Sequence, residues 1–480
     1  MKNGNGVGGG REARSGCVAE ALERRQLLAA SMAAFTIGGA GGDNARDVYA
    51  DRRNGTYVAG DFTGRVDFQK GVGAHVVNAG SKADPSQRLS YVAKYGRNGS
   101  VEWVRAFDDA NVHVSGVEVD SAGHVYVSGG LTVAGPADLD PSRRRVLVDG
   151  TTAPNFVAKF TANGKLIWGR SVGRGQGMRM AVDPNGGGVF LAGLDYSYEG
   201  PDTNLVRLDS AGEFVWGGRV GTFVQDLVAG RRGGVFLTGT VQGSGDVDPG
   251  PGERLLATGG RPAGSYVQAI DADGALAWAT VDGDSRNTRG RAVAVDAFDN
   301  VVVAGTRQYR RPRGNDDAPF SLVLQKLDRT GTPVWRRETV GGSVLGVTGV
   351  DADETGDVVV GGTYRGQNLV DGTRPDFDAG PGEALPPAAG GGVDAVFLAR
   401  YGADGTFEDL DTARLEVDLT GVVLSAFASG RAGRVVAVGA VGGSVDLDDG
   451  PGVTTLTAAS PVLGFQLRDG DGFVWELAYV

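Results

Sequence analysis

The sequence predicts an all-β protein, a seven-bladed β-propeller of four-stranded antiparallel blades, and three observations lead to this fold class. The chain has 480 residues, more than one ordinary hydrophobic core fills, so it should contain several domains or one repeat architecture. Glycine occurs 82 times against 18 prolines, and 41% of the residues are hydrophobic, which is typical of many short strands joined by tight turns. From residue 45 onward, one pattern of strands and turns returns seven times.

The first half of each repeat is an alternating segment, a turn, and a second strand that ends in glycine. Alternation of β-branched or aromatic residues with polar ones indicates half-buried strands. The second strands are expected at residues 56–60, 125–129, 189–193, 235–239, 301–305, 358–362 and 435–439.

The second half of each repeat is a third strand, a glycine turn and a fourth strand that usually carries tryptophan. Asn-Gly, Asp-Gly or Ala-Gly between two strand-like runs is a hairpin signal. A four-stranded sheet that is apolar on both faces cannot stand alone, so such units stack face to face around an axis. The tryptophans at this position are Trp103, Trp168, Trp216, Trp278, Trp335 and Trp475, and the sixth repeat lacks one.

The repeat boundaries divide the chain into a leader and one propeller. We expect a leader at residues 1–33 and the propeller at residues 34–480. The last repeat is expected to supply its own fourth strand at Phe473–Val480, although Phe35–Ile37 could augment it. The expected blades span approximately residues 44–107, 108–172, 173–220, 221–283, 284–341, 342–413 and 414–480.

Three motifs follow one another in the repeats and resemble D-x-x-G-N-x-Y-x-x-G, D-F-x-P-G-x-G and F-V-x-K-L-x-x-x-G-x-x-x-W of bacterial SBBP-type β-propeller repeats. The first motif, D-x-x-G-N-x-Y, is matched at residues 51–57 and 120–126, and at residues 296–302 with a substitution at its aromatic position. The resemblance covers about residues 36–480, and the third repeat is shorter than the family pattern. The family has no single known activity, so the resemblance implies a fold rather than a function.

The N-terminal region has the charged-then-apolar order of an export signal. Arg24 and Arg25 precede Leu27 and Leu28, and the apolar stretch ends by Ile37, too short to span a bilayer as a helix. The segment is similar to a twin-arginine signal and to the LEPR-XLL motif of large bacterial surface proteins, with Arg24 where that motif has proline. Both resemblances imply an extracellular or cell-surface protein. The alternative is an irregular tail that carries no targeting signal.

Composition excludes several classes of function. The formal net charge of -11 argues against nucleic acid as a partner. With Cys17 alone, the chain can form no intramolecular disulfide and no cysteine-based metal site. No transmembrane segment is expected, and we expect a monomer.

A candidate site lies on the face formed by the long loops between second and third strands. Binding groups often sit on variable loops held by a rigid scaffold. Three of these loops repeat the motif Asp-x-Asp-x-Gly-Pro-Gly, and paired carboxylates in an extended segment could bind Ca²⁺. Alternatively, the carboxylates accept backbone N–H groups in a turn. The candidate calcium ligands, and the only candidate cofactor site, are Asp246, Asp248, Asp376, Asp378, Asp446 and Asp448.

Two functions fit these features. The first is an exported, non-enzymatic binding or scaffolding module that contacts an extracellular glycan, protein or envelope component through the long-loop face. The second is a polysaccharide hydrolase or lyase with a site at the mouth of the central channel. Facing carboxylates with a raised pKa in a compact pocket would favour the enzyme, and a broad mixed surface would favour the binding module. No catalytic residue can be chosen from the sequence.

Overall fold

The computed structural model describes most of the chain as β-strands and turns. Among the described residues there is no helix, so the all-β prediction is confirmed. The described residues are 33–39, 42–51, 53, 55–69, 73–79, 87–132, 135–142, 144–151, 153–173, 176–197, 200–260, 263–282, 288–308, 320–365, 373–387, 394–415, 422–429, 434–441, 444–446, 455–457 and 471–478.

The main strands form four-stranded antiparallel sheets that follow one another along the chain, and we number these sheets in chain order. Sheet 1 contains β2 (Asn44–Ala50), β3 (Thr56–Thr63), β6 (Arg88–Tyr95) and β7 (Val101–Ala106). Sheet 2 contains β8 (Val112–Val119), β9 (Val125–Leu131), β12 (Asn155–Phe160) and β13 (Leu166–Val172). Sheet 3 contains β14 (Gln176–Val182), β15 (Val189–Ser197), β16 (Gly200–Leu208) and β17 (Phe214–Val220).

The later sheets have the same order of strands. Sheet 4 contains β18 (Phe223–Ala229), β19 (Val235–Val241), β22 (Gly264–Ile270) and β23 (Leu276–Val281). Sheet 5 contains β24 (Thr288–Val295), β25 (Val301–Gln308), β26 (Phe320–Leu327) and β27 (Pro333–Glu338). Sheet 6 contains β28 (Ser343–Ala352), β29 (Val358–Arg365), β30 (Asp394–Tyr401) and β31 (Phe407–Leu415). Each predicted second strand of these six repeats lies in the second strand of a sheet, as expected.

Sheet 7 is assembled from both ends of the chain. Its order is β32 (Val422–Ser429), β33 (Arg434–Val441), β36 (Asp471–Ala478) and β1 (Ala33–Gly39). The expectation that Phe473–Val480 forms the fourth strand is therefore wrong, because β36 lies in third place, between β33 and β1. The N-terminal strand takes the outer position, with Ala33 opposite Glu476 and Ile37 opposite Gly472.

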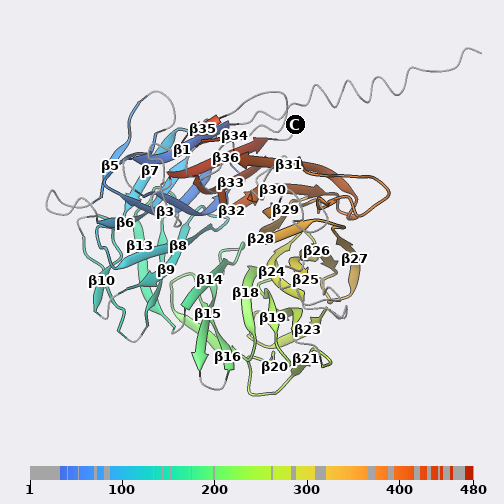
Figure 1. Cartoon of the computed structure of the whole chain (residues 1–480). Coiled ribbons are helices and arrows are strands. Elements are labelled where there is room, and N and C mark those ends of the chain that lie inside the picture. Colours follow the sequence, from blue (N-terminus) through green and yellow to red (C-terminus); the bar gives the residue numbers. More distant parts are fainter. Residues whose placement is uncertain are drawn as a thin grey trace, which may run out of the picture.

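The sheets succeed one another around the molecule, and their colours run from blue through green and yellow to red (Figure 1). The first strand of each sheet contacts the first strand of the next, from β2 and β8 through to β28 and β32. Strand β2 also contacts β32 and β33, so sheet 7 lies beside sheet 1.

The apolar core lies between neighbouring sheets. One cluster of buried side chains joins Tyr57 and Trp103 of sheet 1 to Phe156 of sheet 2. Another joins Trp335 of sheet 5 to Phe397 of sheet 6. Because both faces of a sheet are apolar, removing one sheet would expose the faces of two neighbours.

Tryptophans link each of sheets 1 to 5 to the sheet that follows it by a hydrogen bond. The indole N–H of Trp216 donates to the carbonyl of Ala272, in the turn before the fourth strand of sheet 4, at 3.0 Å. Gly274 in that turn has a φ of +89°, and a Cβ there would lie 2.8 Å from the Trp216 ring. The same indole-to-carbonyl bond is made by Trp103 to Ala162, Trp168 to Ser210, Trp278 to Arg329 and Trp335 to Ala403.

Two further positions of the repeat, a buried lysine on the third strand and an aspartate in the first turn, form ion pairs. The ammonium of Lys326 lies 3.0 Å from Asp296, in the first turn of its own sheet, and donates to the Ala403 carbonyl of the next sheet. Lys159 lies 3.7 Å from Asp120 and donates to the Ser210 carbonyl in the same way. A buried cation needs such partners, so the repeated aspartate and lysine support each other.

Candidate functional site

Several loops that join second and third strands fold into small hairpins at the periphery of the molecule (Figure 1). These hairpins are β4 (Arg65–Asp67) with β5 (Val76–Asn78), β10 (Pro136–Asp138) with β11 (Leu147–Asp149), β20 (Ser244–Asp246) with β21 (Leu255–Ala257), and β34 (Ser444–Asp446) with β35 (Thr455–Thr457). Residues 376–384 of sheet 6 make the equivalent turn, closed by the Phe377 N–H and the Ala384 carbonyl. We call these five segments clasps.

Each clasp contacts the end of the fourth strand of the preceding sheet. Strand β4 of sheet 1 pairs with Gly38 and Gly39 of β1, and β34 of sheet 7 pairs with the last residues of β31. Asp376 pairs with Val340, which follows β27. The carbonyl of Asp246 accepts the N–H of Gly221, and the N–H of Asp138 donates to Asp109. The clasps therefore join neighbouring sheets along their outer edges.

The first aspartate of the motif closes the clasp by accepting two backbone N–H groups. Oδ1 of Asp246 accepts from Asp248 at 3.0 Å and from Arg254 at 2.8 Å. Oδ1 of Asp376 accepts from Asp378 at 3.0 Å and from Ala384 at 2.8 Å. The extended Asp-x-Asp segment and the returning strand are thus held together at each end of the turn.

The second aspartate of the motif shapes the tip of the clasp. Oδ1 of Asp248 accepts the N–H of Gly250 at 2.9 Å, and Oδ1 of Asp378 accepts the N–H of Gly380 at 2.7 Å. Asp446 ends β34, and Asp448 lies outside the described residues. Within the part of the chain that the structure describes, no three carboxylate, imidazole or thiol side chains gather in a way that could hold a metal ion. The calcium site stays a prediction.

The apolar residue that follows the first aspartate is buried beneath the clasp, a feature that the sequence analysis missed. Phe68 lies with its ring centroid 4.8 Å from that of Tyr91 on β6, and Phe377 lies 4.7 Å from Phe397 on β30. The carbonyl of Val247 accepts a hydrogen bond from the buried Gln268 side chain. The alternation of acidic and apolar residues in the motif could have revealed this burial.

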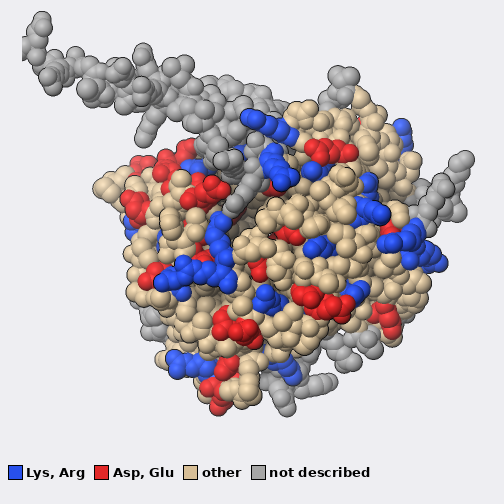
Figure 2. Space-filling view, turned by 180° about the vertical axis from the view of Figure 1, so that it is seen from behind, with Lys and Arg blue, Asp and Glu red and all other residues tan. Residues whose placement is uncertain are grey.

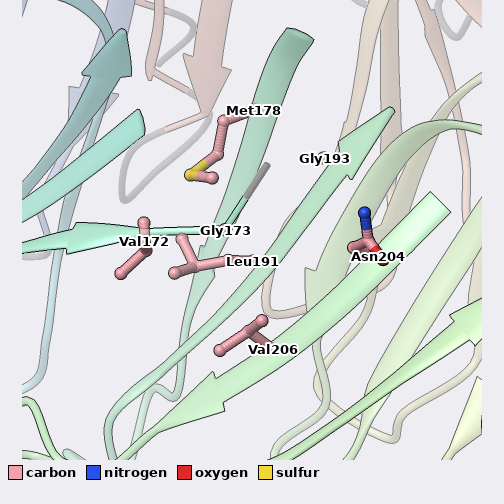
Figure 3. A pocket seen from close by; sticks show the side chains of 7 residues that line it. All are labelled: Val172, Gly173, Met178, Leu191, Gly193, Asn204 and Val206. Atoms are coloured by element: carbon pink, nitrogen blue, oxygen red, sulfur yellow. The ribbon is translucent and has the colours of Figure 1, made fainter. Parts of the chain in front are cut away.

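Two small cavities lie at junctions where the described residues of the following sheet form no clasp. The first lies between sheets 2 and 3, where the side chains of Val172, Met178, Leu191 and Val206 surround a space with Asn204 at its side (Figure 3). The second lies between sheets 4 and 5 and is lined in part by Thr306, Val323 and Gln325. Each encloses about 10 Å³, room for about one water molecule.

The first strands carry carboxylates whose pKa is raised by burial. The pKa of Glu118 rises to about 8, and the pKa values of Asp47, Asp226 and Asp351 rise to about 6. The charge of Asp226 also raises the pKa of Asp47, and the guanidinium of Arg179 lowers the pKa of both carboxyl groups.

Each of these carboxylates also accepts a backbone N–H from the first strand of the following sheet. The donors are Val117 to Asp47, Val182 to Glu118, Val293 to Asp226 and Ser429 to Asp351, at 2.7 to 2.9 Å. The side chains keep part of their surface exposed although protein surrounds them. They can therefore link sheets near the centre of the molecule, and in protonated form they could donate a proton.

Charges of both signs are spread over the surface. Lysine and arginine side chains alternate with aspartate and glutamate on the face seen from behind (Figure 2). In the described residues, no helix is long and apolar enough to cross a membrane.

Comparisons with known proteins give weak likenesses. No family model and no curated protein matches the chain. Among solved structures, an ulvan lyase of a polysaccharide lyase family is 11% identical with a TM-score of 0.41, covering 85% of this chain and 93% of its own. Sqt1 of Chaetomium thermophilum is 10% identical with a TM-score of 0.38, covering 86% and 97%. A Bacteroides caccae protein of unknown function is 12% identical with a TM-score of 0.33, covering 66% and 88%.

Proposed function

We propose that the chain is a closed seven-bladed β-propeller that acts outside the cytoplasm as a non-enzymatic binding module. In this proposal each numbered sheet is one blade, and β1 closes the ring by completing sheet 7. The contacts of β2 with β32 and β33, together with the pairing of β1 and β36, support the closure. Export and a cell-surface location are supported by the resemblance of residues 22–30 to export and surface-protein motifs.

The observation that most supports a binding role is that the clasps hold exposed apolar residues in fixed positions. Leu147 begins the return strand of one clasp with 50% of its surface exposed, and Leu255 begins the return strand of another with 57% exposed. Both strands are paired within their hairpins. Exposed apolar side chains on a rigid support are typical of surfaces that contact a partner.

A binding assay against defined polysaccharides tests this proposal. The purified full chain is run by affinity electrophoresis through gels that contain each polysaccharide, and the mixtures are assayed for new reducing ends and unsaturated products. We expect retardation by at least one acidic or neutral glycan without chain cleavage. The double variant Leu147→Ser with Leu255→Ser should lose retardation while keeping its thermal unfolding midpoint. Cleavage products, or equal retardation of the double variant, would contradict the proposal.

The carboxylate of Glu118 favours an alternative function as a hydrolase or lyase. A pKa near 8 keeps this group protonated at neutral pH, which suits a general acid. In the same assay, cleavage that is lost in Glu118→Gln would establish the enzyme. The hydrogen bond from Val182 to Glu118 instead supports a role in joining sheets 2 and 3.

A further inference from the structure

Two arginines, Arg289 and Arg291, lie near the start of β24, the first strand of sheet 5. Arg289 pairs with Thr306 near the end of β25, so both arginines lie at the end of the sheet from which the connection between second and third strands leaves. Arg291 is the extra residue of a β-bulge, since the pairing passes from Gly290 directly to Ala292. A bulge re-aims the side chain of its extra residue. The two arginines are therefore carried on the long-loop face, beside the centre of the molecule, where the first strands meet (Figure 1).

Neither guanidinium group has a partner among the described residues. The side chains of Arg289 and Arg291 form no hydrogen bond and no ion pair there. Arg291 is half-buried, and burial together with the charge of Arg289 lowers its pKa. In contrast, Arg307 on the neighbouring strand forms an ion pair with Glu338. A desolvated cation without a counterion is costly, so these two arginines favour the arrival of an anion.

Sheet 1 carries an arginine at the same place, and there the chain itself supplies the anion. Arg46 is the extra residue of the bulge in β2, and it forms an ion pair with Asp61, whose side chain is 2% exposed. Asp61 directly follows the glycine at which the two strands pair before the bulge, as Thr306 does in sheet 5. Sheet 5 thus has a threonine hydroxyl where sheet 1 has the carboxylate that neutralises its arginine.

In sheets 2, 4 and 7 both of these places are uncharged. The bulges hold Ser115, Gln225 and Ser425, and the places that correspond to Asp61 hold Gly130, Thr240 and Ala440. A neutral residue therefore meets the packing needs of the bulge in three sheets. The charge of Arg291, which no carboxylate at position 306 balances, indicates a ligand.

We propose that Arg289 and Arg291 bind the carboxylate group of a sugar acid. The planar N–H arrays of guanidinium groups match the two oxygens of a carboxylate. The ion pair of Arg46 with Asp61 is the precedent for this contact, with the carboxylate of the ligand in the place of the aspartate. The carboxylate follows from the arginines, whereas the sugar rests on the proposed function. A glycan that contains uronate units presents such carboxylates along its length.

Trigalacturonate and its methyl ester are the probes, because esterification removes the charges and keeps the sugars. Binding of each to the full chain is measured by isothermal titration calorimetry. We expect the acid to bind about tenfold more tightly than the ester, with an affinity that falls as salt is added. Arg291→Gln should weaken binding of the acid about tenfold, because charge-assisted hydrogen bonds are lost. Arg46→Gln, at the bulge whose arginine already has a partner, should leave the affinity for the acid unchanged.

A carboxylate introduced at position 306 should compete with the ligand. Thr306→Asp should abolish binding of trigalacturonate and raise the thermal unfolding midpoint by several degrees, because Arg291 would gain the kind of partner that Arg46 has in Asp61. Thr306→Asn, which has the shape of the aspartate variant without its charge, should keep the affinity within about twofold. Equal affinities for the acid and the ester, or unchanged binding in Arg291→Gln and in Thr306→Asp, would overturn the proposal.

These ligands separate the arginine site from the proposed function. Binding of trigalacturonate that depends on Arg291, without retardation of the chain by any polysaccharide, supports the arginine site and contradicts the glycan-binding expectation. Retardation by polysaccharides, with equal affinities for the acid and its ester, overturns the arginine site and leaves the binding module standing.

Discussion

At the scale of single residues, the repeat is explained by contacts that cross from one sheet to the next. Tryptophan recurs because its indole reaches a turn carbonyl in the following sheet, as Trp216 reaches Ala272. The glycine of that turn recurs because its backbone is left-handed and the tryptophan ring lies against its Cα, as Gly274 shows. Sequence periodicity predicted the strands, but it could not say which residues meet across sheets, since the partners lie 56 residues apart for Trp216 and 59 for Trp103.

Replacing Gly274 with alanine should therefore destabilise the protein for two reasons. A left-handed backbone costs an alanine about 1–2 kcal/mol, and the clash of the new methyl group with Trp216 should raise the total to about 3 kcal/mol. Gly259 has a φ of +65° with nothing within 4 Å of a Cβ, so Gly259→Ala carries the backbone cost alone. Urea unfolding of both variants measures the difference. Equal losses would mean that the tryptophan contact contributes nothing.

At the scale of elements, the clasp is the unit that sequence analysis interpreted least completely. The spacing of Asp246 and Asp248 suits two carboxylates beside a cation and equally suits two carboxylates that accept backbone N–H groups, because both need the same extended alternation. The structure shows the hydrogen bonds to backbone N–H groups, and the calcium site stays a prediction. The contact with the preceding sheet was not predictable, since nothing in the local sequence encodes the distant strand end.

Loss of the first aspartate should weaken the clasp more than loss of the second. Asp246→Ala removes an acceptor for two backbone N–H groups and should cost about 2–3 kcal/mol, whereas Asp248→Ala removes one such bond and should cost about 1 kcal/mol. Hydrogen exchange of the Gly221 amide, which donates to the Asp246 carbonyl, should speed up mainly in Asp246→Ala. The reverse order of the two variants would argue against this account of the motif.

Calcium dependence separates the two interpretations of the same aspartates. If the carboxylates serve only as acceptors for backbone N–H groups, the thermal unfolding midpoint should be the same in Ca²⁺ and in excess chelator at fixed ionic strength. A rise of several degrees with Ca²⁺ would mean that the native protein binds the ion and would restore the predicted site.

At the scale of the whole molecule, contacts between first strands join neighbouring sheets at the centre. Contacts between clasps and fourth strands join them at the rim. The all-β class and the strand positions followed from alternation and glycine turns. For sheet 7 the sequence analysis allowed that Phe35–Ile37 could augment the last repeat, as it does, but it did not place β36 third and β1 fourth, because this pairing joins segments from opposite ends of the chain. Pairing between chain ends leaves no periodic signal in either segment.

The central carboxylates should make stability depend on pH across the whole molecule. A carboxyl group whose pKa is raised by folding stabilises the fold below its unfolded pKa, and this contribution is lost as the pH rises through its folded pKa. For Asp47 and Asp226 that value is about 6, and for Glu118 it is about 8. The temperature of the unfolding midpoint should therefore fall as the pH rises from about 4 to about 8. Glu118→Gln keeps an oxygen acceptor for Val182 and should flatten the upper part of this fall, and an unchanged profile would contradict the assignment.

The outer place of β1 in sheet 7 has a consequence for biosynthesis. Ala33 pairs with Glu476, so the earliest described strand waits through about 440 residues of translation before its partner exists. At typical elongation rates of about 5–20 residues per second, that interval lasts about 20 to 90 seconds. During this interval, the short apolar strand has unpaired backbone groups at its edges and can form β-sheet hydrogen bonds with other nascent chains. Holdase chaperones, which keep such a strand from aggregating, would therefore matter more for the yield of this protein than for its final stability.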